Sequence, residues 1–523
     1  MRRLVITGFR LSQSIRIDLL KPAIACILAL LSCSTFDTKA GSKPAGMQAV
    51  VKTLHLAALK AGESRYHYVP FQVPSGASQI KISYDYDHAN GANALDIGLF
   101  DSRSKDLGGD VQGFRGWSGG RRSEFFISRR DATPGYIPGD LPAGTWRIIL
   151  GLYRIVPEGV DVSFKISIET RETNLINEMS SPQSFAGPPR LVMTDERKTV
   201  MPPERSRRWV TGDLHMHTVN SDGDWTVGQL LAAAKDARLD FISITDHNTF
   251  SHHAEIDRLA CPQTDLLVIR GEEITTYGGH ANAWGLPANT LIDFRIQPGD
   301  EEAMARVVAE THRRGALISI NHPFAACAGC SWSYDAEATG FDAIEVWNGS
   351  WDSPDEEALA FWDKLLQKGR RITAIASSDS HRSANPIGQA ATHLAVAGRL
   401  SVKAILNSIR AGRVYLTSSP AAPLITFEAQ TPGDHATRSI GDVIRLGKWH
   451  RVRFKLAVSK VSGPATMTLI SQGQVIRTFP ADDGKAHFVE IDSAHDAYFR
   501  LEVRDQNKSM LAMTNPIYVE TGR

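Results

Sequence analysis

Two short motifs, HMH at 215–217 and TDH at 245–247, constrain the fold of this chain more than any other feature. They lie within one segment, 211–248, in which an apolar run, a turn, a helical pattern with a capping box and a second apolar run follow one another. On a strand, residues two apart point to the same face, so His215 and His217 can reach one ion. The segment predicts a β–α–β unit with ligand-type side chains at the carboxyl ends of both strands, where α/β sheets keep their chemistry.

Residues 209–418 continue this alternation of short apolar strands and helices. Three further helix starts are marked by capping residues, at Asp300, at Ser353 before a proline, and at Ser401. The apolar runs between the helices end in polar residues, as in NHP at 321–323. The pattern predicts an α/β fold, either a barrel or a doubly wound sheet.

The regions on either side predict β structure. At 160–168 every second residue is apolar, and this alternation is typical of a strand with one buried face. The same alternation occurs at 452–458, near the other end of the chain. We therefore expect β-sandwiches at 45–170 and 419–523 and a proline-containing linker at 171–208.

Charge and length exclude some classes of partner. The chain has 523 residues, a formal net charge of +1 and 22% charged residues. This length suits about three domains. The charge balance, without a basic run, argues against a nucleic-acid partner. Beyond the N-terminal segment, no stretch approaches the roughly 18 apolar residues of a membrane span. The sequence carries no signal for an oligomeric state.

The segment 1–40 predicts a signal peptide. Several arginines precede the apolar run 23–31, which is long enough for a signal peptide and too short to cross a bilayer. Two cleavage sites are open, after residue 32 with Cys33 as a lipid anchor, or after Ala40. Either predicts an exported protein, periplasmic or lipid-anchored in a bacterial envelope. A cytoplasmic protein with a misassigned start is the alternative.

Five cysteines are too few for a disulfide scaffold. Cys327 and Cys330 form a CxxC pair five residues after His322. In an exported protein a local disulfide is the simplest interpretation, and redox catalysis or metal binding is the alternative.

Imidazoles and carboxylates are concentrated in the α/β region, where most of them follow an apolar strand. The candidate metal ligands are His215, His217, Asp222, His247, Glu273, His280, His322, Asp379 and His381. Their nitrogen and oxygen atoms suit zinc, manganese or iron, and the absence of thiolates argues against a closed structural zinc site. A network of satisfied buried polar side chains is the alternative.

Six motifs carry a resemblance to a known family: DLHMHTVNSDG, ITDHN, GEEIT, GGHANAWG, NHP and SSDSHR. They occur in the order found in the PHP family, named for polymerase and histidinol phosphatase, and the chain resembles that family over about 209–400. The resemblance implies a distorted (β/α)7 barrel with two or three divalent metal ions in a cleft.

The resemblance also implies how the ligands are shared. The first ion would be surrounded by His215, His217, Glu273 and Asp379. Glu273 would bridge to a second ion held by His280 and His322, and a third would be held by Asp222, His247 and His381. Two positions stay open, because Glu272 is an alternative to Glu273 and Asp224 lies close to Asp222.

The function implied is hydrolysis of a small-molecule ester, with phosphoesters favoured. A bound metal lowers the pKa of water from about 15.7 toward 7, so metal-bound hydroxide is available at neutral pH. Domain order and export further resemble the branch that includes bacterial carbaryl hydrolases, the CehA/McbA-like group. That likeness implies carbamate or carboxylic esters as an alternative. A non-catalytic metal- or ligand-binding module is the third hypothesis.

Other side chains have two interpretations each. Asp246 and His381 are the candidate catalytic residues, and Asp246 either orients a ligand or moves a proton. Arg382 either grips an anionic substrate or is solvated. His252 and His253 are expected at the surface. Five aromatic residues line an apolar pocket or belong to the core: Trp225, Phe324, Trp332, Trp347 and Trp351.

Overall fold

The computed structural model describes residues 46–60, 62–105, 111–170, 207–259, 265–327, 329–421, 423–434, 436–446 and 451–521. The chain divides into two compact units, and these residues belong to the unit Pro44–Arg523. The predicted signal segment 1–40, with Cys33, lies outside the described residues. So does the predicted linker 171–208, except for its last two residues, which begin a strand.

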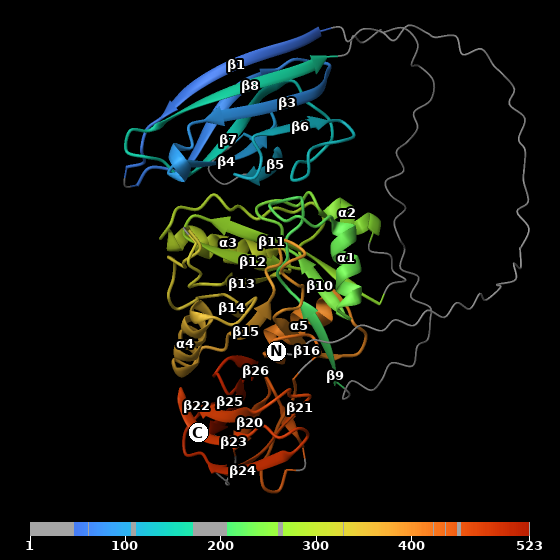
Figure 1. Cartoon of the computed structure of the whole chain (residues 1–523), viewed down its shortest axis with the longest axis vertical. Helices are drawn as coiled ribbons and strands as arrows, with labels where there is room; N and C mark the ends of the chain where they lie inside the picture. Colours follow the sequence, from blue (N-terminus) through green and yellow to red (C-terminus); the bar gives the residue numbers. More distant parts are fainter. Residues whose placement is uncertain are drawn as a thin grey trace, which may run out of the picture. The chain divides into compact units, whose positions relative to one another are not determined.

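The N-terminal region, blue to teal in Figure 1, consists of two four-stranded antiparallel sheets. Its strands are β1 (Gly46–Leu56), β2 (Tyr66–Val73), β3 (Ala77–Tyr86), β4 (Ala94–Phe100), β5 (Phe114–Gly119), β6 (Glu124–Ser128), β7 (Gly144–Arg154) and β8 (Val160–Thr170), with a 3-10 helix η1 (Ala89–Gly91). The sheet orders are β1-β8-β3-β6 and β2-β7-β4-β5. Val162, Phe164 and Ile166 of β8 are buried at alternate positions and share one core with Ile97 and Ile148 of the second sheet. The predicted alternation is therefore confirmed, and it produces two packed sheets.

The middle region alternates strands and helices as predicted. Its strands are β9 (Arg207–Asp213), β10 (Phe241–Ile244), β11 (Leu267–Thr276), β12 (Gly279–Trp284), β13 (Leu317–Asn321), β14 (Ala343–Asn348), β15 (Thr373–Ser377), β16 (Ala391–Ala397) and β17 (Val414–Thr417). Its helices are α1 (Val227–Asp236), α2 (His253–Leu259), α3 (Glu301–Arg313), α4 (Ser353–Gln367) and α5 (Val402–Arg410). The strands form one sheet in the order β15-β14-β13-β12-β11-β10-β9-β16-β17, so the mixed α/β class is confirmed.

Three of the helices begin at the predicted capping residues. Thr226 and Gln229 form the capping box of α1, with each side chain bonded to the other's backbone N–H. Asp300 caps α3 and Ser401 caps α5, whereas the cap of α4 is Asp352, one residue before the predicted start. These caps satisfy backbone donors that a helix N-terminus leaves open. None of the helices within the described ranges is long and apolar enough to span a membrane.

The sheet departs from a parallel (β/α)7 pattern. β12 follows β11 after a two-residue turn and pairs antiparallel with β11 and β13, because so short a turn cannot hold the crossover that a parallel neighbour needs. β16 is antiparallel to β9. Over the described ranges the ladders do not close into a ring. The Thr392 hydroxyl of β16 bonds to the backbone N–H and C=O of Ala376 in β15, at 3.0 and 2.6 Å. The two strands therefore approach each other, and a closed barrel stays a prediction.

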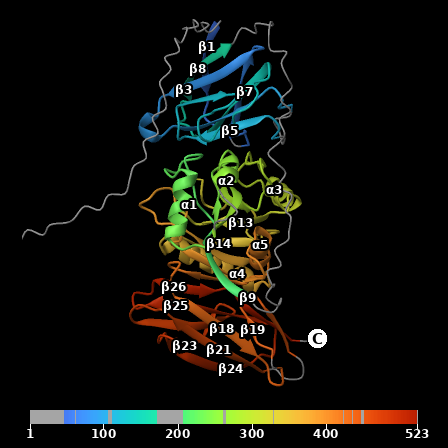
Figure 2. The same cartoon turned by 90° about the vertical axis from the view of Figure 1, so that its right-hand side faces the viewer.

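The C-terminal β region is joined to the α/β sheet by hydrogen bonds. Its strands are β18 (Leu424–Gln430), β19 (Arg438–Ser439), β20 (Val443–Leu446), β21 (Arg451–Ser459), β22 (Ala465–Ser471), β23 (Gln474–Pro480), β24 (Ala486–Asp492), β25 (Ala497–Asp505), β26 (Met510–Thr514) and β27 (Ile517–Thr521). β26 pairs with β17, so the large sheet runs on through β26-β25-β22-β23. A second sheet, β19-β18-β21-β24, shares a core with it, and β21 and β24 lie side by side in Figure 2. The predicted domain boundary at 418/419 would therefore place β17 and its hydrogen-bonded partner β26 in different domains.

Candidate metal centre

The predicted ligands lie at the ends of neighbouring strands of the α/β sheet. β9 ends at Asp213, so His215 and His217 lie just beyond the strand, whereas the prediction put them on it. Met216 still forms an isolated bridge with Ser380, which keeps this segment extended, and the two histidine rings lie 5.0 Å apart. Asp222 lies in the loop between β9 and α1. The other predicted ligands lie in β11 and β12 or follow β10, β13 and β15: Glu273, His280, His247, His322, Asp379 and His381.

Four side chains form what we call the inner group: His215, His217, Glu273 and Asp379. Nε2 of His215 lies 3.2 Å from Oε1 of Glu273 and 3.3 Å from Oδ1 of Asp379. Nε2 of His217 lies 3.5 Å from Oε2 of Glu273 and 3.0 Å from Oδ1 of Asp379. Ligands bound at 2.0–2.2 Å from one zinc ion lie roughly 3–4 Å from one another. The inner group therefore has the spacing of a metal site.

His280 and His322 approach the same carboxylate from another side. Nδ1 of His280 and Nε2 of His322 each lie 3.3 Å from Oε1 of Glu273. Sγ of Cys330 lies within 4.8 Å of ligand atoms of both histidines, but it is bonded to Cys327 in a disulfide. The local disulfide was the simplest interpretation of the CxxC pair, and it is confirmed. Because metal binding by cysteine needs a thiolate, the donors here are the two imidazoles and Glu273.

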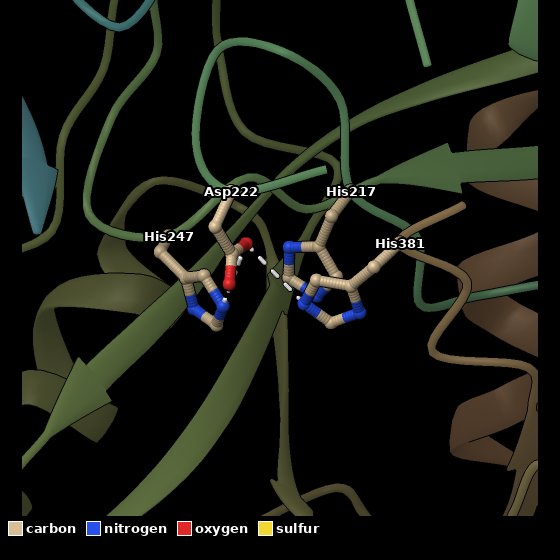
Figure 3. A group of neighbouring side chains, drawn as sticks. All are labelled: His217, Asp222, His247 and His381. Atoms are coloured by element: carbon tan, nitrogen blue, oxygen red, sulfur yellow. Dashed lines mark ion pairs between the residues drawn. The ribbon is translucent and has the colours of Figure 1, made fainter. Parts of the chain in front are cut away.

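Four side chains, shown in Figure 3, form what we call the outer group: His217, Asp222, His247 and His381. Oδ1 of Asp222 lies 3.4 Å from Nε2 of His247 and 3.2 Å from Nε2 of His381. His217 belongs to both groups, so the groups adjoin. Asp224 instead pairs with Arg121 at 2.7 Å. Of the two candidate acids, Asp222 is therefore the one that faces the histidines.

The neighbouring acids of β11 point to opposite sides of the strand, as alternation requires. Glu273 faces the histidines, whereas Glu272 accepts a hydrogen bond from the backbone N–H of Ile292 at 2.7 Å. Burial raises the pKa of Glu272 well above its ordinary value, which disfavours the ionised form that a metal ligand needs. The structure thus brings Glu273, and not Glu272, into the inner group.

Many buried polar atoms of these groups have no hydrogen-bond partner among the described residues. They are Nε2 of His215, both ring nitrogens of His217, Oδ1 of Asp222, Oε2 of Glu273, Nδ1 of His280, Nδ1 of His322 and Oδ1 of Asp379. A buried polar group left unsatisfied costs about 1–3 kcal/mol. A network of mutually satisfied side chains would not leave so many open, whereas divalent cations would use these nitrogen and oxygen atoms as ligands. The residues therefore fit a metal centre.

Burial and charge act on the pKa values in opposite directions. Burial would raise the pKa of Glu273 and of Asp379, but the surrounding histidines hold both well below their ordinary range. Burial, together with nearby His381 and His247, lowers the pKa of His217 to about 4. Burial also disfavours the protonated form of His247, but the carboxylates around this residue favour it and raise its pKa to about 9. Ionised carboxylates and a neutral His217 are the forms that bind a metal.

Two buried acids outside the predicted set support its members. Oε1 of Glu345 lies 3.0 Å from Nδ1 of His215, and Oε2 accepts a hydrogen bond from the backbone N–H of His322 at 3.0 Å. Asp213 accepts hydrogen bonds from the backbone N–H groups of His215 (3.2 Å) and Gly388 (2.7 Å). The sequence analysis did not identify Glu345, although an acid inside the apolar run of β14 is a signal that could have pointed to it.

Asp246, a candidate catalytic residue, bonds to the loop that follows β9. It accepts hydrogen bonds from the backbone N–H and the hydroxyl of Thr218, both at 2.7 Å, and from the Ser221 hydroxyl at 2.6 Å. Nδ1 of His252 lies 3.1 Å from its carboxylate. His252 and His253 are fully buried, so the expectation that they lie at the surface is wrong. The reason is that α2 packs against β11.

A cavity of about 430 Å³ adjoins the outer group and is lined in part by Asp222 and His247. Its aromatic side chains come from Trp117, Tyr153 and Tyr277. The five aromatic residues proposed for an apolar pocket are not among the described residues that line it. For Trp347 the core alternative holds, because it is 1% exposed within the main core.

Comparison with known proteins gives a partial family match. Residues 366–414 match a family described as PHP-associated. No protein with a curated description matches the chain. A two-domain protein of Bacteroides vulgatus, which contains a predicted PHP-like metal-dependent phosphoesterase, is 17% identical over 60% of this chain and 96% of that chain, with a TM-score of 0.36. A protein of Bifidobacterium adolescentis described as a candidate metal-dependent phosphoesterase is 17% identical over 34% and 89%, with a TM-score of 0.26. TM-scores this low do not establish a shared fold.

Proposed function

We propose that the chain is a metal-dependent hydrolase of the PHP type that cleaves small-molecule esters, with phosphoesters as the favoured class. One observation carries this proposal. Buried imidazole nitrogens and carboxylate oxygens face one another around Glu273 and Asp379, and many of them have no hydrogen bond within the described residues. A polar network that served stability alone would satisfy its members. The PHP-associated match at 366–414 supports the family.

The donor set suits two or three divalent ions, with zinc, manganese or iron as the candidates. Such ions, when bound, supply an activated water near neutral pH and positive charge opposite the oxygen that becomes negative. Glu345 holds Nδ1 of His215 and so leaves Nε2 to act as a ligand. Asp246 positions the loop that carries Asp222, through Thr218 and Ser221. His381, whose Nε2 lies 3.2 Å from Asp222, is our second candidate catalytic residue and would act as a ligand of the outer ion.

A carbamate or carboxylic ester hydrolase of the carbaryl-hydrolase type is the second candidate. The aromatic lining of the cavity favours it, since Trp117, Tyr153 and Tyr277 give an apolar surface close to Asp222 and His247. Both candidates use the same donor groups, so the substrate and not the metal distinguishes them.

Export to a bacterial envelope belongs to the same proposal. The segment 1–40 has the composition of a signal peptide, and the Cys327–Cys330 disulfide suits an oxidising compartment. A closed barrel at 209–418 and sandwich domains at 45–170 and 419–523 complete the architecture that we propose.

Parallel assays on one preparation test the function. The mature chain is analysed for bound metal and assayed with a phosphomonoester, a phosphodiester and an aryl carbamate, with His217→Ala as the control. We expect metal-dependent turnover of a phosphoester that His217→Ala loses together with its metal. Turnover of the carbamate alone would select the second candidate. Metal binding without turnover of any ester would instead identify a binding module.

A further inference from the structure

The cavity beside the outer group has walls from two distant parts of the sequence. One wall carries Asp222 and His247, whose side chains converge in Figure 3. The facing residues include Asp96, Trp117 and Tyr153 from the N-terminal β region. Small-molecule sites span about 300–1,000 Å³, so a cavity of about 430 Å³ suits a small substrate.

Arginines fix the N-terminal β region to the loop that follows β9. Arg122, in the turn between β5 and β6, donates to the backbone oxygens of Val219 at 2.6 Å and Ser221 at 3.2 Å. The adjacent Arg121 pairs with Asp224 at 2.7 Å. Both contacts join this turn to the loop that also carries Asp222. These contacts therefore hold the N-terminal β region next to the loop that carries Asp222.

Three aromatic side chains give the cavity an apolar surface. The rings of Tyr153 and Tyr277 lie 5.7 Å apart, and the Tyr277 hydroxyl donates to Oδ2 of Asp96 at 2.6 Å. Trp117 packs against Phe294, with ring centroids 4.9 Å apart, in a core that both regions share. Because packing and a hydrogen bond hold these rings, a bound aromatic group would meet a preorganised surface.

The cavity lining includes two arginines besides the acids Asp96 and Asp222. Arg121 and Arg382 both line it, and a guanidinium suits an oxyanion. Since Arg121 already pairs with Asp224, Arg382 is the cation that we assign to a substrate anion. Arg382 directly follows His381 of the outer group, so an anion at Arg382 would lie near the ligands.

We infer that the N-terminal β region forms the side of the cavity that selects the substrate, through Trp117 and Tyr153, and we call this side the specificity wall. The substrate that fits is a small aromatic ester carrying a negative charge. An aryl phosphate is the simplest member of this class. Its ring lies against Trp117, Tyr153 and Tyr277, and its charged group faces Arg382 and the outer group. The hydrolysis of this ester rests on the proposed function, whereas its recognition is a separate statement about binding.

Calorimetry on the full mature chain loaded with Mn²⁺ tests the inference with two phosphonates that are not hydrolysed. We expect phenylphosphonate to bind about 10-fold more tightly than methylphosphonate, because only the former has a ring. Tyr153→Leu should weaken phenylphosphonate by about 2- to 10-fold and leave methylphosphonate unchanged. Tyr153→Phe keeps the ring and should keep the preference. The control is Tyr86→Leu, a half-buried tyrosine of β3 that does not line the cavity.

Equal binding of the two phosphonates by the wild type overturns the inference, and so does an equal response of Tyr153→Leu and Tyr86→Leu. If Tyr153→Leu does not fold, the wild-type comparison and Tyr153→Phe decide. Turnover separates the two proposals. Equal hydrolysis of phenyl and methyl phosphates keeps the proposed function and removes the specificity wall. A Tyr153-dependent preference for phenylphosphonate without hydrolysis of any ester keeps the wall and removes the function.

Discussion

His217 and His393 are both buried in the α/β region, at 0% and 1% exposure, yet their surroundings differ. Burial lowers the pKa of both, to about 4 and about 3. Nδ1 of His393 lies 2.9 Å from the Thr211 hydroxyl and Nε2 lies 2.8 Å from the Thr417 hydroxyl. Neither ring nitrogen of His217 has a hydrogen-bond partner among the residues that the structure describes.

The comparison separates a structural histidine from a candidate ligand. His393 meets its polar requirement within the described chain, as buried polar groups in proteins normally do. His217 instead faces the carboxylates of Glu273 and Asp379 at 3.5 and 3.0 Å, so its nearest polar neighbours are themselves groups that bind divalent metal ions. Burial and a shifted pKa alone would not distinguish the two.

The largest expected effect is that of Glu273→Gln. Glu273 approaches five of the histidines, and loss of its charge removes the acid that the inner group shares with His280 and His322. We expect activity to fall by more than about 100-fold, beyond the cost of losing a supporting partner. Bound metal, measured by mass spectrometry on the purified chain, should fall in parallel.

Glu272→Gln is the matched control on the same strand. Glu272 accepts one backbone hydrogen bond, which a glutamine oxygen also accepts, and burial already disfavours its ionised form by raising its pKa. Metal content and turnover should change by less than about 2-fold, as for a substitution that leaves the ligands in place. Loss of metal in Glu272→Gln with metal retained in Glu273→Gln would reverse the assignment of the two acids.

A smaller loss is expected for Glu345→Gln, which tests a positioning residue. Glu345 holds Nδ1 of His215 and the backbone of His322, and loss of such a partner typically weakens metal binding by about 10- to 100-fold. Titration of the metal-free chain with Mn²⁺ measures the affinity. Glu158→Gln, at an exposed turn, should bind as the wild type does. Equal affinities for Glu345→Gln and Glu158→Gln would show that His215 needs no support.

Asp222→Asn should cost less again, because it affects only the outer group. We expect one ion to bind about 10-fold more weakly while the inner group keeps its metal. Asp224→Asn is the matched control two residues on, since Asp224 pairs with Arg121 and not with the histidines. The same Mn²⁺ titration, fitted for separate sites, measures the difference. Loss of all bound metal in Asp222→Asn would mean that the two groups do not bind independently.

Local rules of sequence predicted those parts of the fold that depend on neighbours along the chain. The capping box at Thr226, the alternation in β8 and the polar residues after apolar strands are all visible within a few positions. The antiparallel β12 departs from the repeating β–α pattern because its turn is only two residues long. That turn, Tyr277–Gly278, could have signalled a hairpin.

The parts that sequence did not reveal depend on contacts between distant residues. Glu345 meets His215 across 130 positions, and Arg122 meets Val219 across 97. The burial of His252 arises from packing of α2 on β11, which the dipeptide His-His does not encode. Trp117 and Tyr153 line the cavity because the N-terminal β region packs against the α/β region, so no motif in the α/β region predicts their place there.

The smallest effect concerns His393, where acid should reduce stability without involving the metal groups. The folded pKa of about 3 lies below the ordinary 6.5, so between these values the unfolded chain binds a proton that the folded chain does not. The contribution of His393 to the free energy of unfolding is fully present above about pH 6.5. It is lost as the pH falls below that value, by at most about 1.4 kcal/mol per pH unit. His393→Gln cannot titrate, so metal-free His393→Gln should lose about 1 kcal/mol less than the metal-free wild type between about pH 6 and about pH 5. Thermal unfolding at the two pH values measures this difference, and equal losses would mean that His393 is protonated in the folded chain.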